Sequence, residues 1–141
     1  MEKSFCIDMD NVLVDFPSAF EYLNEDALKK YEGKLDEVPG IFALMKPVDG
    51  AMEAFKKLSQ KCDAYILSTS TWNNPTAWSD KLEWVKKYLE YVVYKRLILT
   101  HHKNLNKGDY LIDDRTKKGQ EILRESLFYL ELINFKTGKA F

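Results

Sequence analysis

Short apolar runs alternate along this chain with longer segments in which apolar residues recur every three or four positions. The short runs are rich in aliphatic and aromatic residues, as expected for strands that are covered on both faces. They are residues 4–9, 64–68, 96–99, 110–113 and 129–134. The longer segments, residues 49–61 and 79–91 with a weaker candidate at 116–126, have the spacing of amphipathic helices. Strands that alternate with helices are typical of an α/β fold with a parallel sheet.

The two stronger helices each have an apolar face that we expect to pack against the sheet. In the first helix this face consists of Ala51, Ala54, Phe55 and Leu58, and in the second of Leu82, Val85, Tyr88 and Leu89. Trp84 lies on the second helix, and we interpret it as a core residue. Trp72 lies in the loop after the second apolar run and is a candidate for lining a site there.

Residues 17–46 interrupt the alternation between the first strand and the first helix. Ser18 followed by Glu21 is a capping-box pattern, which predicts the start of a helix, and Asp15 is a second candidate for its cap. We therefore expect a small helical cap over residues 17–46, inserted into a single domain that covers residues 1–141.

The composition limits the classes of function. With 141 residues and 45% hydrophobic content, the chain can form one domain with a substantial core. The formal charge of -1 gives no basic surface for a nucleic acid polymer or an anionic membrane, and no apolar run is long enough to span a bilayer. The two cysteines, Cys6 and Cys62, suit reduced and partly buried thiols. We expect a soluble protein of the cytoplasm.

Polar side chains gather where the predicted strands end. They are Asp8 and Asp10 after the first strand, Ser68, Thr69 and Ser70 after the second, Lys103 after the third, and Asp113 and Asp114 after the fourth. Each alone is more often a turn former, a helix cap or a solvated side chain. The carboxyl ends of parallel strands share one edge of a sheet, however, so these residues converge. Clustered carboxylates repel one another unless a cation holds them together.

This set of residues suits phosphoryl transfer with Mg²⁺. Magnesium takes one or two protein carboxylates together with the phosphate of the substrate, and Asp8 and Asp113 could supply them. A carboxylate can attack phosphorus if the phosphoryl charge is neutralised, and Lys103 and the donors around Ser68 could do so. Asp10 would then protonate the leaving alcohol and activate water.

At these residues the chain resembles the haloacid dehalogenase (HAD) superfamily of phosphatases. The resemblance rests on "DMDNVL", on the serine that ends "AYILS", on Lys103 and on "LIDD". It implies a three-layer α/β sandwich around a central parallel sheet of about five strands. It also implies that Asp8 is the nucleophile and Asp10 the general acid and base. The metal would lie on Asp8, the Asp10 carbonyl and Asp113, with Asp114 as a further or water-mediated ligand.

Further segments are similar to the 5'(3')-deoxyribonucleotidases of the cytosolic and mitochondrial type. They are "DMDNVLVDF", "PGIFALMKPVDGAMEA", "EWVKKYL", "LTHHK" and "LIDDR". The resemblance implies that Phe16 and Phe42 face the nucleoside and that Thr69 helps to hold phosphate. It implies hydrolysis of deoxynucleoside monophosphates through an aspartyl-phosphate. A small nucleotide is then the expected partner, and a homodimer is a candidate assembly.

Three departures from that family accompany the resemblance. Residues 17–46 are much shorter than the family's cap, Asn11 replaces a frequent glycine, and His101 and His102 replace a basic residue. Asn11 is compatible with an unusual backbone angle. Because the cap is short, a phosphatase for another small phosphomonoester, such as a sugar phosphate, is the alternative.

Two alternatives from other classes are a signalling receiver domain and a metal-binding protein without turnover. In a receiver the acidic pair comes early and the lysine last, whereas here the acidic pair follows Lys103. Metal binding alone would not require a proton-carrying side chain at Asp10. Both alternatives are therefore disfavoured.

Overall fold

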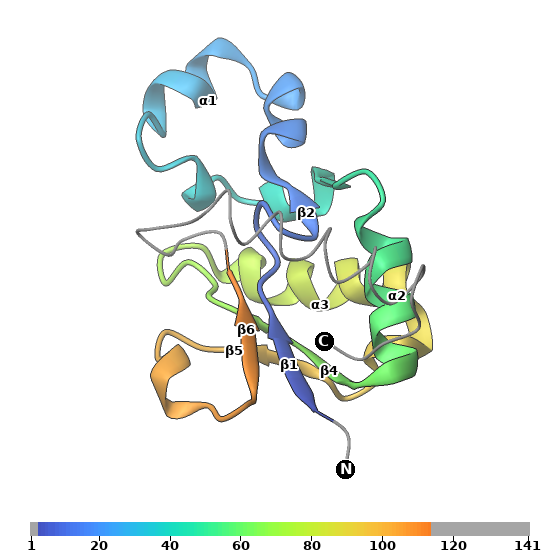
Figure 1. Ribbon diagram of the computed structural model, residues 1–141. Helices are drawn as coiled ribbons and strands as arrows, with labels where there is room; N and C mark the ends of the chain where they lie inside the picture. Colours follow the sequence, from blue (N-terminus) through green and yellow to red (C-terminus); the bar gives the residue numbers. More distant parts are fainter. Residues whose placement is uncertain (1–2, 114–141) are drawn as a thin grey trace.

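The computed structural model describes residues 3–113, and its main sheet has four parallel strands. The strands are β1 (Ser4–Ile7), β4 (Asp63–Ser68), β5 (Leu97–Leu99) and β6 (Tyr110–Ile112). Their order across the sheet is β5-β4-β1-β6, and every neighbouring pair is parallel. Because β1 pairs with β4 on one side and β6 on the other, its carboxyl end lies in the middle of the sheet edge (Figure 1).

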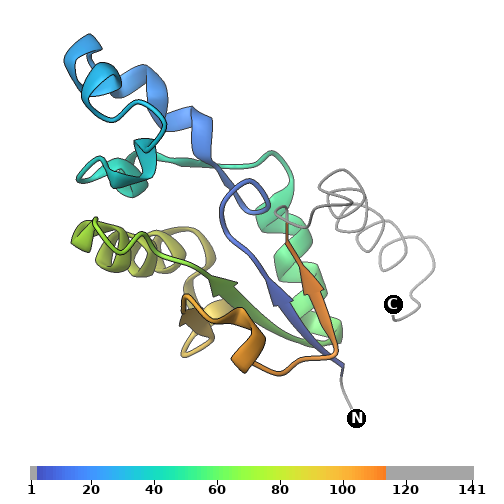
Figure 2. The same cartoon turned by 90° about the vertical axis from the view of Figure 1, so that its left-hand side faces the viewer.

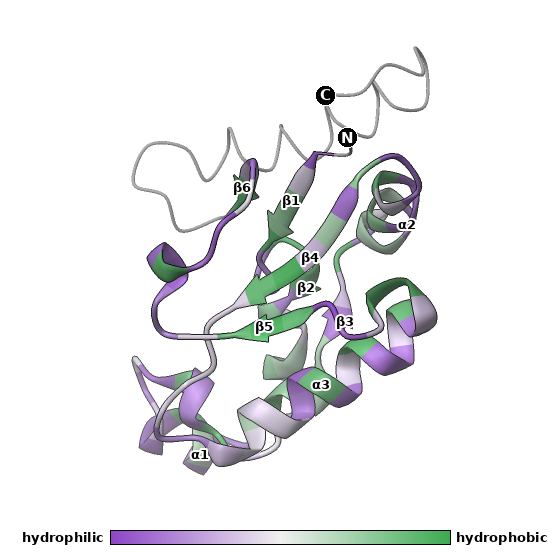
Figure 3. Cartoon of the chain, turned by 90° about the horizontal axis from the view of Figure 1, so that it is seen from below, coloured by the Kyte–Doolittle hydropathy of each residue, from purple (hydrophilic) through white to green (hydrophobic). Residues whose placement is uncertain are grey.

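Two α-helices lie on the same face of this sheet (Figure 3). Helix α2 (Ala51–Lys61) buries the four apolar residues predicted for it. Helix α3 (Pro75–Leu89) begins earlier than predicted because Pro75 suits the first helical turn, where its missing N–H is not needed. Its buried side chains are Ala77, Lys81, Trp84, Val85 and Leu89. The prediction that Leu82 belongs to the buried face is wrong, whereas Trp84 is a core residue as predicted.

The core fills the space between the helices and one face of the sheet. Phe55 of α2, Ile7 of β1 and Ile66 of β4 are fully buried there. The two cysteines are reduced and buried, in line with the sequence, and the Cys62 thiol donates a hydrogen bond to the Leu58 carbonyl. The predicted HAD-like α/β fold with a central parallel sheet is confirmed. The predicted strand at 129–134 and helix at 116–126, on which a fifth strand and a third layer depend, lie outside the described residues.

The inserted cap stands beyond the carboxyl ends of the strands (Figures 1 and 2). At its base, β2 (Val14–Asp15) pairs in antiparallel fashion with β3 (Lys46–Pro47). Between these strands the chain forms the 3-10 helices η1 (Phe16–Tyr22), η2 (Leu35–Glu37) and η3 (Ile41–Leu44), and the α-helix α1 (Glu25–Lys30). Within residues 3–113, two further 3-10 helices lie outside the cap, η4 (Glu90–Val93) and η5 (Lys103–Leu105).

The predicted capping box at the start of the cap is wrong. Ser18 lies within η1, and its hydroxyl donates to the Asp15 carbonyl and accepts from the Lys46 amide at 2.9 Å. Asp15 occupies the cap position, but its side chain makes no capping hydrogen bond. The Ser18 hydroxyl instead connects the segment that enters the cap after β2 with the segment that leaves it at β3. This is a tertiary contact that a local sequence pattern does not reveal. The first α-helix of the cap follows Asn24, whose side chain accepts from the Ala27 amide.

Candidate active site

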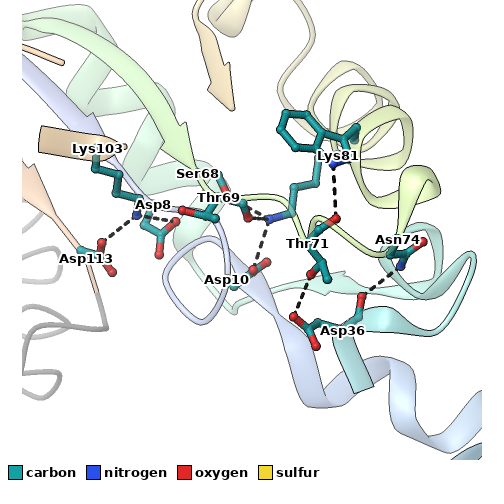
Figure 4. A network of polar contacts seen from close by, with 11 residues as sticks. Asp8, Asp10, Asp36, Ser68, Thr69, Thr71, Asn74, Lys81, Lys103 and Asp113 are labelled. Carbon is teal, nitrogen blue, oxygen red and sulfur yellow. Dashed lines mark hydrogen bonds and ion pairs between the residues drawn. The ribbon is translucent and has the colours of Figure 1, made fainter. Parts of the chain in front are cut away.

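Asp8 is the first residue after β1, and its carboxylate is almost completely buried, with 2% of the residue exposed. Its amide donates to the Ile112 carbonyl, which fixes the backbone beside β6. The Lys103 ammonium lies 3.2 Å from Asp8 Oδ1 and 2.7 Å from Asp113 Oδ2 (Figure 4). Asp113 is buried as well. The structure thus brings together the predicted residues from the ends of β1 and β6 and from the loop after β5.

Burial raises the pKa of Asp8 to about 7, because the charged carboxylate loses its hydration. The Lys103 ammonium opposes this shift, whereas the neighbouring Asp113 and Asp10 carboxylates add to it. A cation placed against Asp8 would favour the ionised carboxylate, which is the form that can act as a nucleophile.

Asp10 lies at the start of a tight turn over residues 9–14. The Met9 carbonyl accepts hydrogen bonds from the amides of Val12, Leu13 and Val14. Asn11 adopts the left-handed region with φ 63°, as its tolerance of unusual angles predicts. The Asp10 carboxylate points toward Lys81 of α3 and away from Lys103 (Figure 4).

Lys81 of α3 is a site residue that the sequence reasoning missed. Its side chain is 0% exposed, and its ammonium lies 3.2 Å from Asp10 Oδ2. The same ammonium donates to the Ser68 hydroxyl at 2.9 Å and to the Thr69 carbonyl at 2.6 Å (Figure 4). Its signal in the sequence was a lysine at the i+4 position between two apolar residues of the buried face, Ala77 and Val85.

The Lys81 ammonium also lies over the Phe42 ring, 4.7 Å from its centre. The Phe16 and Phe42 rings meet edge to face, with their centres 5.8 Å apart. Phe42 is only 3% exposed, whereas Phe16 is half-buried. The structure therefore brings the two predicted substrate-facing aromatics together beside Asp10, with the Phe42 ring largely covered.

Trp72 of the loop after β4, His101 of the loop after β5 and Trp78 of α3 form an aromatic group. The His101 ring centre lies 5.9 Å from that of Trp72 and 5.8 Å from that of Trp78. Trp72 is 77% exposed, and both histidines are surface residues. The described contacts of Trp72 are thus with this group rather than with the carboxylates.

The residues around Asp8 fit a divalent cation. Asp8 and Asp113 are two buried carboxylates that share one ammonium, so a further positive charge would be favourable between them. Within residues 3–113, Asp10 Oδ1 is buried without a hydrogen-bond partner. This part of the chain contains no group of three or more His, Cys, Asp or Glu side chains in a metal-binding arrangement. Asp114, the remaining predicted ligand, lies outside it.

A parallel sheet that carries an Asp-x-Asp pair after β1, hydroxyls after β4 and an acidic residue after β6 defines the site of a HAD-type phosphohydrolase. Comparison with known families identifies the family within this class of phosphohydrolases. Residues 24–129 match the family described as "5' nucleotidase, deoxy (Pyrimidine), cytosolic type C protein". The chain belongs to this family of phosphoric monoester hydrolases. Membership of the family suggests a divalent metal at the site.

Individual relatives are described as deoxyribonucleotidases. A "Putative 5'(3')-deoxyribonucleotidase" of Vibrio phage KVP40 is 59% identical over 113 residues, which cover 80% of this chain and 66% of the relative. A protein of the same description from Staphylococcus aureus (strain Mu50) is 34% identical, covering 82% of this chain and 76% of its own. The "5'(3')-deoxyribonucleotidase" of Bacillus subtilis (strain 168) is 31% identical, covering 81% and 77%. The chain thus spans roughly two-thirds to three-quarters of the length of these relatives.

None of the helices within residues 3–113 has the length and apolar character needed to cross a membrane.

Proposed function

We propose that this protein is a Mg²⁺-dependent 5'(3')-deoxyribonucleotidase that works through a phosphorylated Asp8. The observation that carries the proposal is the pairing of each carboxylate of the Asp-x-Asp motif with a different lysine, of which Lys81 is fully buried and Lys103 is partly buried. Asp8 lies against Lys103, and Asp10 lies against Lys81, at one edge of the sheet. Two carboxylates in separate environments suit a nucleophile and a proton carrier, and two ammonium groups suit a phosphate between them.

The proposed reaction has two steps. Asp8 attacks phosphorus, a bond forms between its carboxylate oxygen and phosphorus, and the bond from phosphorus to the substrate alcohol breaks. Asp10 gives its proton to the leaving alcohol oxygen. In the second step Asp10 takes a proton from water, whose oxygen attacks phosphorus and releases Asp8 and inorganic phosphate.

We propose that Lys81, Lys103 and the Ser68 hydroxyl neutralise or bind the phosphoryl oxygens in both steps; in support, Lys103 lies against Asp8, and Lys81 donates to the Ser68 hydroxyl. Thr69, whose carbonyl contacts Lys81, follows in the same loop and is the proposed further phosphate-binding residue. Magnesium, which Asp8, Asp113, the Asp10 carbonyl and Asp114 would hold, supplies positive charge that orients and polarises the phosphate.

The test is phosphate release from 5' and 3' deoxynucleotides, sugar phosphates and a small aryl phosphate, with and without Mg²⁺. Asp8→Asn should abolish turnover, and Asp10→Asn should abolish turnover while leaving metal binding intact. Asp15→Asn is a matched control, because Asp15 is an exposed aspartate of the same segment. Undiminished turnover in Asp8→Asn would refute the phospho-aspartate mechanism.

Metal binding has a readout that does not depend on activity. A ligand that binds only the folded state stabilises it by about 2.7 kcal/mol at a hundred times its Kd. We expect Mg²⁺ to raise the melting temperature of the wild type, and Asp113→Asn to weaken this effect strongly. An equal Mg²⁺ effect in both proteins would remove Asp113 from the metal site.

A second candidate substrate class is favoured by the covered Phe42 ring and the short cap. A sugar phosphate has no base to stack, so it would need no exposed aromatic at this point. Activity restricted to sugar phosphates would retain the mechanism and replace the nucleotide assignment. The single domain, a cytoplasmic location and a homodimer stay predictions, and the last is checked by size-exclusion chromatography with light scattering.

A further inference from the structure

The cap is fastened to the main domain by a set of hydrogen bonds between two short segments. We call residues 36–40 the cap arm and residues 71–76 the anchor loop. Asp36 accepts from the Thr71 hydroxyl at 2.7 Å, and Glu37 accepts from the Asn73 amide at 2.8 Å. The anchor loop follows the Ser68–Thr69 pair and leads directly into α3, so it connects the cap to the helix that carries Lys81 (Figure 4).

Asn74 is the buried centre of this fastening, with 1% of the residue exposed. Its side-chain amide donates to the Asp36 carbonyl at 2.9 Å and to the Val38 carbonyl at 3.0 Å. Asn74 stands at the cap position of α3, where asparagine commonly accepts a hydrogen bond from the first helical turn, yet it makes no such bond. Its side-chain oxygen, the atom that would cap the helix, accepts from the Thr76 hydroxyl instead, while its side-chain NH2 makes the two tertiary bonds to the cap arm.

Further hydrogen bonds join the first turn of α3 to the end of the cap arm. The Thr76 hydroxyl accepts from the Gly40 amide at 2.9 Å, and the Asn74 side-chain oxygen accepts from the Thr76 hydroxyl at 2.7 Å. Gly40 has a φ of 79°, a left-handed conformation that suits glycine and turns the chain into η3.

Farther along α3, Lys81 meets the Phe42 ring of η3, and Trp84 Nε1 donates to the Met45 carbonyl at 3.0 Å. The order of contacts on the helix therefore matches the order of residues through η3. The segment that contains Phe42 is laid along α3, directly beside the ammonium that contacts Asp10.

Lys81 does not depend on the cap arm for its own position. Its ammonium is held by the Ser68 hydroxyl and the Thr69 carbonyl, both at the end of β4. Loosening of the cap arm would therefore displace η3 while leaving the phosphate-binding side of the site in place. The two parts of the site can be separated experimentally.

We propose that Asn74 is a positioning residue that fixes η3 on α3 and thereby sets the affinity for the organic part of the substrate. This inference rests on the proposed function. It adds that hydrogen bonds from Asn74 hold the short cap in a fixed position over the site. The described side-chain hydrogen bonds of Asn74 go to the cap arm and to Thr76, and none goes to Asp8, Asp10 or Asp113. Its effect should fall on the KM of a nucleotide and not on the hydrolysis of a small phosphate ester.

The experiment compares Asn74→Ser and Asn74→Asp with Asn73→Ala. Serine remains a good helix cap but lacks the amide, and aspartate keeps the shape but presents oxygen to two carbonyls. Asn73→Ala is the matched control, since it removes one exposed bond to the same cap arm. We expect KM for a deoxynucleoside monophosphate to rise about tenfold in Asn74→Ser, in line with the loss of two buried hydrogen bonds. The kcat for an aryl phosphate should stay within about twofold, and Asn73→Ala should resemble the wild type.

Amide hydrogen exchange gives a second readout that needs no substrate. Faster exchange across residues 36–44 in Asn74→Ser, with the strands of the main sheet unchanged, supports the fastening. Equal losses on nucleotide and aryl phosphate would assign Asn74 a general structural role and overturn the proposal, as would unchanged exchange in the cap arm. If the wild type cleaves the aryl phosphate but no nucleotide, the proposed substrate fails, and the exchange measurement still decides whether Asn74 holds η3.

Discussion

Replacement of Lys81 by methionine tests the site where the structure adds most to the sequence. The Lys81 side chain is fully buried, and its ammonium contacts Asp10 Oδ2, the Ser68 hydroxyl and the Thr69 carbonyl. Methionine has a similar length and fills the same channel without the charge. The substitution therefore removes the ammonium while it keeps most of the apolar packing against Phe42.

Two effects of opposite sign determine how Lys81→Met changes the free energy of unfolding. Hydrogen bonds to a charged group contribute about 1.5–3 kcal/mol each, and Lys81 makes three of them. Burial of the ammonium itself costs several kcal/mol, which is regained when the charge is removed. The Asp10 side chain is 28% exposed, so water can replace part of what it loses. We expect a net loss of unfolding free energy of about 1–3 kcal/mol.

Activity should fall further than stability does. Removal of one preorganised donor to a developing charge lowers kcat by about 10²–10³-fold. The assay is kcat for an aryl phosphate and for a deoxynucleotide, alongside urea unfolding at the same temperature. Lys86→Met is the control, because Lys86 is an exposed lysine of the same helix that pairs weakly with Glu83. A Lys81→Met protein that folds and retains kcat within about tenfold of the wild type would refute the placement of Lys81 at the phosphate.

Two further predictions concern stability. The Ser4 amide and hydroxyl donate to the Asp109 carboxylate and hold its pKa below the usual range, so this stabilisation is present above the pKa of an unfolded aspartate and is lost as pH falls through the lower folded value. Asp109→Asn should thus lower the melting temperature near neutral pH, and the gap to the wild type should narrow below about pH 4; a constant gap would contradict this. Phe55→Ala empties a fully buried position under α2 and should cost about 3–5 kcal/mol in urea unfolding, whereas a loss below about 1 kcal/mol would mean that the core closes around it.

Features that depend on local pattern were predictable from the sequence. The four strands of the main sheet and the buried face of α2 follow from apolar runs and helical spacing. The convergence of Asp8, Lys103 and Asp113 follows from the rule that the carboxyl ends of parallel strands share an edge. Each of these inferences requires only that a segment be recognised as a strand or a helix and that the strands run in the same direction.

Features that depend on tertiary contact were not predictable in the same way. Lys81 was missed because a lysine on a helix is usually solvated, and its burial is favourable only once Asp10 and Ser68 lie beside it. The capping box predicted at Ser18 was wrong because the hydroxyl accepts a hydrogen bond from the Lys46 amide, in the segment where the chain leaves the cap. Asn74 likewise gave no signal, since its partners are carbonyls in a segment far away in sequence.

The division of the Asp-x-Asp pair explains how the site and the cap are connected. In a continued strand, Asp8 and Asp10 would point to the same face. Here the strand ends at Ile7 and a turn with Asn11 in the left-handed region begins at Met9; Asp8 lies against Lys103, whereas Asp10 lies against Lys81. The proposed nucleophile is thereby buried among charges of the main domain. The proposed proton carrier lies beside the ammonium that also contacts Phe42. A substrate whose leaving group fits against η3 would therefore meet its proton donor at the point where the cap and the main domain join.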